Sequence, residues 1–209
     1  MLALVNRIDW WLRGVTSRLE LQRDGLFEAS RVFTHMTLSE RKQLFHLASG
    51  CPRGATVLEI GSHVGASACF LAAGLKSCGA GRVFCVDTWN NETMPDGEQD
   101  TFAAFTANTR PFADIITPVR KRSDALVTSD VQLPFDLIFV DGDHSEEAVA
   151  LDFKLVDEWL KPEGVAVLHD FLYFPGVAKT VGHALVSGRW LLDGYIDNMV
   201  WLRRAVMNR

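Results

Sequence analysis

Short apolar runs alternate with longer segments of helical periodicity along most of the chain. The apolar runs lack polar alternation, which is typical of parallel strands buried on both faces of a sheet. Such strands are expected at 56–60, 82–86, 115–119, 135–140 and 165–168. Helices are expected between them and after them, at 66–76, 99–108, 145–160 and 176–186. This alternation predicts a doubly wound α/β domain with a mostly parallel sheet.

Residues 1–50 differ in character from the rest. Apolar residues at helical spacing predict an amphipathic helix near the start, and they are Leu4, Ile8, Trp11, Leu12, Val15 and Leu19. A second helix is expected at 39–49, with Ser39 as its N-cap and Pro52 soon after its end. We therefore divide the chain into an N-terminal helical segment, 1–50, and an α/β domain, 51–209.

The end of the chain predicts a hairpin. Two further strands are expected at 190–195 and 199–203, with no helix between them. Consecutive strands with a tight connection pair antiparallel. The predicted sheet therefore has seven strands, one of them antiparallel.

Composition narrows the classes of protein. The chain has 209 residues, is 48% hydrophobic and carries a formal net charge of −5, with no basic stripe. Dedicated nucleic-acid binding is disfavoured, and Arg120, Lys121 and Arg122 are interpreted as a solvated loop. No apolar run is long enough to span a membrane, and no signal peptide is visible. The four cysteines form no Cys-x-x-Cys pair, so we expect reduced thiols and a cytoplasmic protein.

A glycine turn follows the first strand of the predicted α/β domain. Gly61 permits a tight turn, and Gly65 lets the next helix begin close to the strand. Position 63 is His, so the Gly-x-Gly-x-x-Gly fingerprint of dinucleotide binding is absent, as is a Walker loop. With the acidic Glu59 just before it, the turn favours an adenosine ligand without phosphates over a purely structural role.

Polar residues follow the second and third strands, at the edge where open α/β sheets bind ligands. Asp87 lies 26 residues after Gly61, so its carboxylate could accept hydrogen bonds from ribose hydroxyls. Trp89 could stack on adenine, line the pocket or pack in the core. Ser123 or Asp124 could accept the adenine amino group, although Ser123 is also a natural N-cap.

Carboxylates and histidines follow the fourth and fifth strands, which should end side by side. Asp141 and His144 come after one strand, and His169 and Asp170 after the other. His144 could act as a general base near neutral pH. Asp141 and Asp170, with His169, could instead hold Mg²⁺, which prefers oxygen ligands. A metal-free Asp–His pair is an equal alternative, whereas Zn²⁺ and Fe²⁺ are disfavoured.

Taken in order, these motifs resemble the class I S-adenosylmethionine (SAM)-dependent methyltransferases. The resemblance covers about residues 54–204. The motifs that carry it are VLEIGS at 57–62, Gly65, Asp87, FDLIFVDGDH at 135–144 and LKPEGV at 160–165. Within the class, the chain looks most like catechol-type O-methyltransferases and related enzymes of polysaccharide and natural-product clusters. The resemblance implies a Rossmann-like fold and SAM as the cofactor.

The resemblance also implies cofactor contacts along these motifs. The residues concerned are Glu59, Gly61, Ser62, His63, Gly65, Ser67, Asp87, Thr88, Trp89, Ser123, Asp124 and Asp141. Gly61, His63 and Ser67 would contact the methionine part of SAM, and Asp87 would bind its ribose. Ser123 and Asp124 would flank the adenine.

The catalytic positions follow from the same resemblance. Asp141 would stand at the family's metal position and Asp170 at its second metal ligand, while His144 takes the place of a lysine base. Phe171 stands where the family usually has an Asn ligand, for which His169 or Asp143 could compensate. The Asn/Asp-Pro-Pro-Tyr/Phe motif of amino-group methyltransferases is absent.

We therefore expect a methyltransferase that moves the methyl group of SAM to a small acceptor, with a sugar or phenol hydroxyl as the target. The rival from another class is a catalytically silent SAM-binding or regulatory protein of the same fold. A nicotinamide dehydrogenase is disfavoured by His63 and by the lack of a second substrate domain. The segment 1–50, which carries Trp10 and Trp11, is expected to close over the acceptor or to form a homodimer contact.

Overall fold

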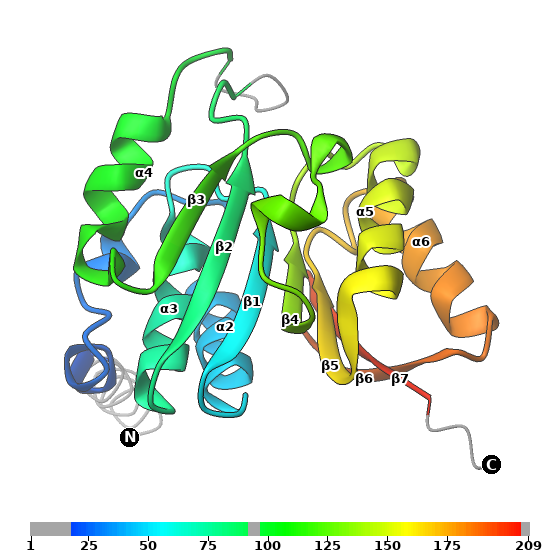
Figure 1. Ribbon diagram of the computed structural model, residues 1–209, viewed down its shortest axis with the longest axis horizontal. Coiled ribbons are helices and arrows are strands. Elements are labelled where there is room, and N and C mark those ends of the chain that lie inside the picture. The colour runs from blue at the N-terminus through cyan, green and yellow to red at the C-terminus, as the bar shows by residue number, and fades with distance from the viewer. Residues whose placement is uncertain (1–17, 92–96, 206–209) are drawn as a thin grey trace, which may run out of the picture.

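A seven-stranded sheet forms the centre of the computed structural model, which describes residues 18–91 and 97–205 (Figure 1). The strand order is β3-β2-β1-β4-β5-β7-β6. The strands are β1 (Ala55–Ile60), β2 (Gly81–Asp87), β3 (Ile116–Arg120), β4 (Phe135–Val140), β5 (Leu160–Leu168), β6 (Trp190–Ile196) and β7 (Met199–Arg204). β1 to β5 pair in parallel, and β7 pairs antiparallel with β5 and β6. The predicted doubly wound sheet and its C-terminal hairpin are confirmed.

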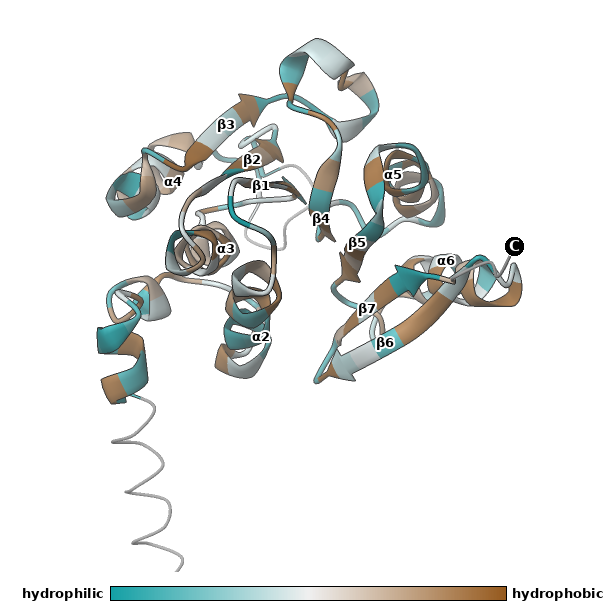
Figure 2. Ribbon diagram, turned by 60° about the horizontal axis from the view of Figure 1, so that its bottom comes forward, coloured by the Kyte–Doolittle hydropathy of each residue, from teal (hydrophilic) through white to brown (hydrophobic). Residues whose placement is uncertain are grey.

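Helices cover both faces of this sheet (Figure 2). One face carries α2 (Leu38–Ser49), α3 (Ala66–Ser77) and α4 (Phe102–Thr109), and the other carries α5 (Glu146–Trp159) and α6 (Pro175–Val186). The short 3-10 turns are η1 (Ala29–Arg31), η2 (Arg110–Phe112), η3 (Ser123–Ala125) and η4 (Thr128–Asp130). None of the described helices is both long and apolar enough to cross a membrane.

The sheet separates two hydrophobic cores. Successive side chains of a strand point to opposite faces, so Val57 packs with α3 on one side and Leu58 with α5 on the other. Both residues are fully buried. Strands buried on both faces explain why the apolar runs show no polar alternation.

The N-terminal part packs against the α/β core. α2 lies so close to α3 that a Cβ on Gly74 would stand 2.7 Å from the Cβ of Ala48. Residues 18–23 are helical, with Leu21 buried but Leu19 exposed, although its spacing had placed Leu19 on the apolar face. The other residues of the predicted first helix, and Trp10 and Trp11, lie outside the described residues.

The N-cap of α2 is Thr37 and not Ser39, so that expectation is wrong. The Thr37 hydroxyl accepts a hydrogen bond from the Glu40 N–H at 3.1 Å, and the Thr37 N–H donates to Glu40 Oε2 at 2.7 Å. This reciprocal pair is a capping box, which satisfies two N–H groups that a helix start leaves unpaired. The arrangement gives Glu40 a fixed place at the beginning of α2.

Two further boundaries differ from the prediction. α4 begins at Phe102 and not at 99, because the Thr101 N–H donates to the Trp89 carbonyl and keeps the preceding residues in a loop. β5 begins at Leu160 and not at 165, because Leu160 is buried and pairs with Phe135 before the register shifts. Neither change moves the carboxyl ends of the strands, where the site lies.

Candidate functional site

Two cavities lie side by side at the carboxyl ends of the parallel strands. The β2 cavity, of about 140 Å³, has Asp87, Thr88, Ser123 and Asp152 among its lining residues. The β5 cavity, of about 380 Å³, is lined by residues that include Phe33, His35, His144, His169, Asp170 and Phe174. Four residues line both cavities, namely Gly61, His63, Asp141 and Gly142. The glycine turn after β1 and the tip of β4 therefore form the wall between two adjacent binding spaces.

Gly61 is required by the approach of two backbones at this wall. Its φ is +86°, and a Cβ there would overlap the carbonyl oxygen of Asp141 and stand 2.8 Å from the Cα of Gly142. Gly65 is similarly constrained, with φ +88° and a virtual Cβ 2.6 Å from the Thr109 side chain. Any larger residue at Gly61 would push β1 and β4 apart where the cavities meet.

Asp87 ties the end of β2 to the glycine turn. Its Oδ2 accepts hydrogen bonds from the backbone N–H groups of Ser62 at 2.9 Å and His63 at 2.8 Å. Its Oδ1 accepts one from the Trp89 N–H at 2.7 Å. A carboxylate has about four acceptor sites, so Asp87 keeps capacity for a ligand hydroxyl while it orders the turn.

Two predicted cofactor residues lie beneath the turn and line neither cavity. Glu59 is fully buried, its Oε2 accepts a hydrogen bond from the Ser62 hydroxyl at 2.5 Å, and burial raises the pKa of Glu59 to about 7. Trp89 is also fully buried, packs on Phe102, and donates from Nε1 to the His63 carbonyl at 2.8 Å. For Trp89 the structure therefore shows core packing. Both residues support the turn from within the protein.

In the segment after β3, one predicted cofactor residue lines a cavity and the other does not. Ser123 lines the β2 cavity, whereas Asp124 is exposed and pairs with Arg122 at 3.0 Å. Arg120 and Lys121 are also held in ion pairs with carboxylates. Each basic residue of this loop is thus paired with a carboxylate, and Lys121 and Arg122 also line the β2 cavity.

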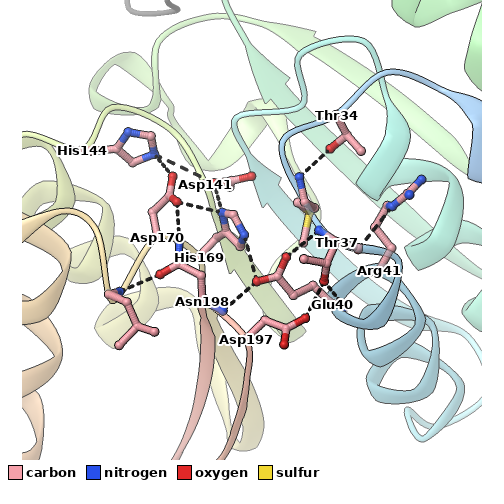
Figure 3. A network of polar contacts seen from close by, with 12 residues as sticks. Thr34, Thr37, Glu40, Arg41, Asp141, His144, His169, Asp170, Asp197 and Asn198 are labelled. Atoms are coloured by element: carbon pink, nitrogen blue, oxygen red, sulfur yellow. Dashed lines mark hydrogen bonds and ion pairs between the residues drawn. The ribbon is translucent and has the colours of Figure 1, made fainter.

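Asp141, His144 and Asp170 gather at one side of the β5 cavity (Figure 3). His144 Nε2 lies 2.9 Å from Asp170 Oδ2 and 3.9 Å from Asp141 Oδ1. One ligand atom from each of the three residues can be chosen so that all lie within 4.8 Å of one another. The tips of β4 and β5 thus bring the predicted catalytic residues together.

A second group of residues lies behind this cluster and holds it in place. His169 is 4% exposed, with Nδ1 3.1 Å from Asp141 Oδ1 and Nε2 3.3 Å from Glu40 Oε1. The Asn198 amide, from the turn between β6 and β7, donates to Asp170 Oδ1 at 2.6 Å. The Asn198 N–H donates to Glu40 Oε1 at 2.8 Å. The start of α2, the tips of two strands and a C-terminal turn therefore meet in one network (Figure 3).

Glu40 and Asn198 escaped the sequence-based prediction. The Thr-x-x-Glu pattern at 37–40 is a capping-box signal and places Glu40 at a helix start. It carries no sign that the same carboxylate reaches a histidine 129 residues further along the chain. That contact depends on how α2 packs, which no local pattern encodes.

The charges of this network are coupled. Burial disfavours charged His169, but its hydrogen bonds with Asp141, Asp170 and Glu40 outweigh burial and raise its pKa to about 12. His144 behaves alike, and Asp141 and Asp170 raise its pKa to about 9. Burial of Asp170 is outweighed by the two histidines, which hold the pKa of Asp170 well below its usual range. Asp141 and Asp170 therefore favour the protonated form of His144, which makes this imidazole a stronger base than an isolated histidine.

Aromatic rings line the rest of the β5 cavity. The Phe174 ring stacks on His144, with centroids 4.1 Å apart and planes at 28°. The Phe33 ring meets His63 edge-on at 6.0 Å and His35 at 5.3 Å. The cavity thus combines a charged cluster with flat apolar surfaces, which suits a small molecule with both a ring and a polar group.

Comparison with known proteins shows which family the chain belongs to. A family model described as "Methyltransferase domain" matches residues 58–171, more than half of the chain. An O-methyltransferase from Bacillus cereus in complex with SAH is 18% identical, with a TM-score of 0.61, and the match covers 88% of this chain and 90% of that one. The O-methyltransferase TomG from Streptomyces achromogenes, in complex with SAM, is 22% identical, with a TM-score of 0.61 and coverage of 88% and 89%.

A third solved structure extends the comparison. The SAH-bound methyltransferase PaMTH1 from Podospora anserina is 16% identical, with a TM-score of 0.64 and coverage of 88% of this chain and 87% of that one. Identities this low establish a shared fold, while the family model matches the ends of β1, β4 and β5, from which residues of both cavities come. The chain therefore belongs to the methyltransferase domain family, on the class I fold of SAM-dependent methyltransferases.

Proposed function

We propose that the protein transfers the methyl group of SAM to a hydroxyl oxygen of a small acceptor, a sugar or a phenol. The observation that carries the proposal is the wall shared by the two cavities. SAM would occupy the β2 cavity with its ribose at Asp87, and its methionine part would pass Gly61 and His63. The acceptor would occupy the β5 cavity, so that its oxygen meets the methyl carbon across that wall.

The reaction chiefly requires alignment. The sulfonium of SAM makes its methyl carbon electrophilic, and holding the acceptor in line with it supplies much of the rate enhancement. The oxygen becomes a better nucleophile as it loses its proton. Asp141, His144 and Asp170 are the groups of the β5 cavity that would orient the hydroxyl and take up this proton.

The same three residues fit a divalent cation. Two carboxylates and one imidazole offer donor atoms within 4.8 Å of one another, a set that suits a hard or borderline divalent ion. A bound ion would supply Lewis-acid stabilisation of the acceptor oxyanion. His169 is not included, because both its ring nitrogens face carboxylates. We assign His169 to orienting Asp141, a role typical of residues behind a metal site.

Binding is the first test of this function. Isothermal titration with SAM should show micromolar affinity, whereas titration with NAD should show none. Asp87→Ala should abolish SAM binding, and Asp124→Asn, which changes an exposed carboxylate outside both cavities, should leave it unchanged. Absence of SAM binding by the wild-type protein would contradict the proposal.

Turnover is the second test. Transfer of labelled methyl groups would be measured on a panel of phenols and sugars, with EDTA and after addition of Mg²⁺. Activity that EDTA removes and Mg²⁺ restores would support the metal, and full activity in EDTA would exclude it. Tight SAM binding without transfer to any acceptor would favour the rival, a catalytically silent SAM-binding protein.

A further inference from the structure

A buried carboxyl group that no sequence motif singled out lines the β2 cavity. Asp152 lies on α5, is 2% exposed, and belongs to the lining of this cavity. The Ser123 hydroxyl is hydrogen-bonded to its carboxyl group, but Oδ1 has no hydrogen-bond partner among residues 18–91 and 97–205. Burial raises the pKa of Asp152 to about 6.

A buried acceptor atom without a hydrogen-bond partner is a sign that a ligand supplies the missing donor. A buried polar atom without a partner destabilises the folded protein, and most buried polar atoms in folded proteins have a hydrogen-bond partner. A group of this kind in a cavity wall is satisfied when a ligand donor arrives. An ionised carboxylate only accepts hydrogen bonds, so the ligand must present a donor at this point.

The position of Asp152 indicates which part of a nucleoside reaches it. Asp87 and Thr88 line the cavity from the end of β2, whereas Asp152 and Ser123 line it from α5 and η3. Apolar Ile60 contributes to the lining as well. A nucleoside with its ribose at Asp87 would lay its base along the apolar wall, with the far edge of the base at Asp152.

A second buried oxygen of the cavity does not compete for this role. Asn91 Oδ1 also lacks a hydrogen-bond partner within the described part of the chain, and Asn91 lines the β2 cavity. It belongs to the loop that follows Asp87, on the side where the ribose is expected. Asp143 lines the cavity too, but its Oδ1 accepts a hydrogen bond from the Ser145 N–H at 2.8 Å.

We propose that Asp152 Oδ1 accepts a hydrogen bond from the exocyclic amino group of adenine and selects adenine over a base with a carbonyl at that position. The inference rests on the proposed function, because it takes the β2 cavity as the adenosine site. A purine with a carbonyl oxygen there would place an acceptor against an acceptor. A site built to bind a donor rejects the analogue that lacks it more strongly than a merely apolar pocket does.

The test compares S-adenosylhomocysteine with its deaminated counterpart, S-inosylhomocysteine, by isothermal titration at pH 8. We expect the wild-type protein to prefer the adenine compound by about 10- to 100-fold, the range of one hydrogen bond to a charged group. Asp152→Asn keeps the shape but can both accept and donate, so the preference should fall below about threefold. Asp152→Ala should weaken binding of the adenine compound and also remove the preference.

Matched variants separate this role from neighbouring acids and from folding. Asp124→Asn, which changes an exposed carboxylate outside both cavities, should keep the wild-type preference, and circular dichroism melting would verify that every variant is folded. Equal affinity of the wild-type protein for the two compounds would overturn the inference even if both bind tightly. A preference that survives in Asp152→Asn, or is lost in Asp124→Asn, would also overturn it. Failure of the wild-type protein to bind either compound would instead overturn the proposed function.

Discussion

The residues at the turn after β1 fall into two groups with different roles. Gly61 and Asp87 line the β2 cavity and set the backbone around it, while Glu59 and Trp89 shape the turn from beneath. The strand-turn-helix pattern predicts this group as a unit. The pattern does not tell the residues that line the cavity from the buried residues that support the turn. That distinction depends on the direction in which each side chain points in the folded protein.

Gly61→Ala isolates the effect of crowding at the shared wall. A non-glycine residue at positive φ costs about 1–2 kcal/mol wherever it stands. Gly54, with φ +78° and nothing within 4 Å of a virtual Cβ, provides the matched control. Gly54→Ala should cost that amount alone, whereas Gly61→Ala should cost about 3 kcal/mol or more, because its Cβ overlaps Asp141. Urea unfolding measures both, and equal losses would contradict the packing argument.

Glu59 makes stability depend on pH. Its pKa rises from 4.5 to about 7 on folding, because burial disfavours the carboxylate. The stability that the neutral acid contributes is complete below about pH 4.5 and is lost as pH rises through 7. The wild-type protein should thus lose about 3 kcal/mol relative to Glu59→Gln between these limits. Denaturant unfolding at several pH values checks this, with the exposed Glu28→Gln as a control that should match the wild-type curve.

At the scale of elements, the start of α2 is less predictable than the carboxyl ends of the strands that build the site. Ser39 was the expected cap of α2, but Thr37, two residues earlier, also carries a hydroxyl that can cap a helix. The structure selects Thr37 because Glu40 then completes the capping box and reaches His169. The carboxyl ends of β1, β4 and β5 are easier to predict, because each apolar run stops at a glycine or a polar residue.

Thr37→Ala and Ser39→Ala form a direct test of this assignment. Thr37→Ala should lower the free energy of unfolding by about 1 kcal/mol, since it leaves the Glu40 N–H without its acceptor. Ser39 is exposed and does not cap α2, so Ser39→Ala should change stability by less than about 0.5 kcal/mol. The reverse order of the two losses in thermal or denaturant unfolding would restore Ser39 as the cap.

For the whole molecule, the proposed function assigns SAM binding to the β2 cavity and methyl transfer to the β5 cavity. His144 lines the β5 cavity and not the β2 cavity. His144→Ala should therefore lower the rate of methyl transfer by about 100- to 10,000-fold, the usual contribution of a group that moves a proton. SAM affinity measured by titration should stay within about threefold of the wild-type value. A parallel loss of affinity would show that His144 belongs to the cofactor site.

The order of elements and the cluster of Asp141, His144 and Asp170 could be predicted because both follow from where strands end. The contacts of Glu40, Asp152 and Asn198 could not be predicted in this way. Each comes from a helix or turn whose local pattern is satisfied by an ordinary structural role. Only packing brings these side chains to the cavities.

The bond between Glu40 and His169 has a practical consequence for engineering. Under the proposed function, exchange of N-terminal segments between relatives is a route to new acceptor preferences, because Phe33 and His35 line the β5 cavity. A crossover placed at residue 50 would replace Glu40 while keeping the His169 that it holds. A crossover before Thr37 would exchange the aromatic wall but leave the capping box and its buried carboxylate with their native partners. Chimeras should therefore be joined within the N-terminal helical segment, 1–50, at a point before Thr37.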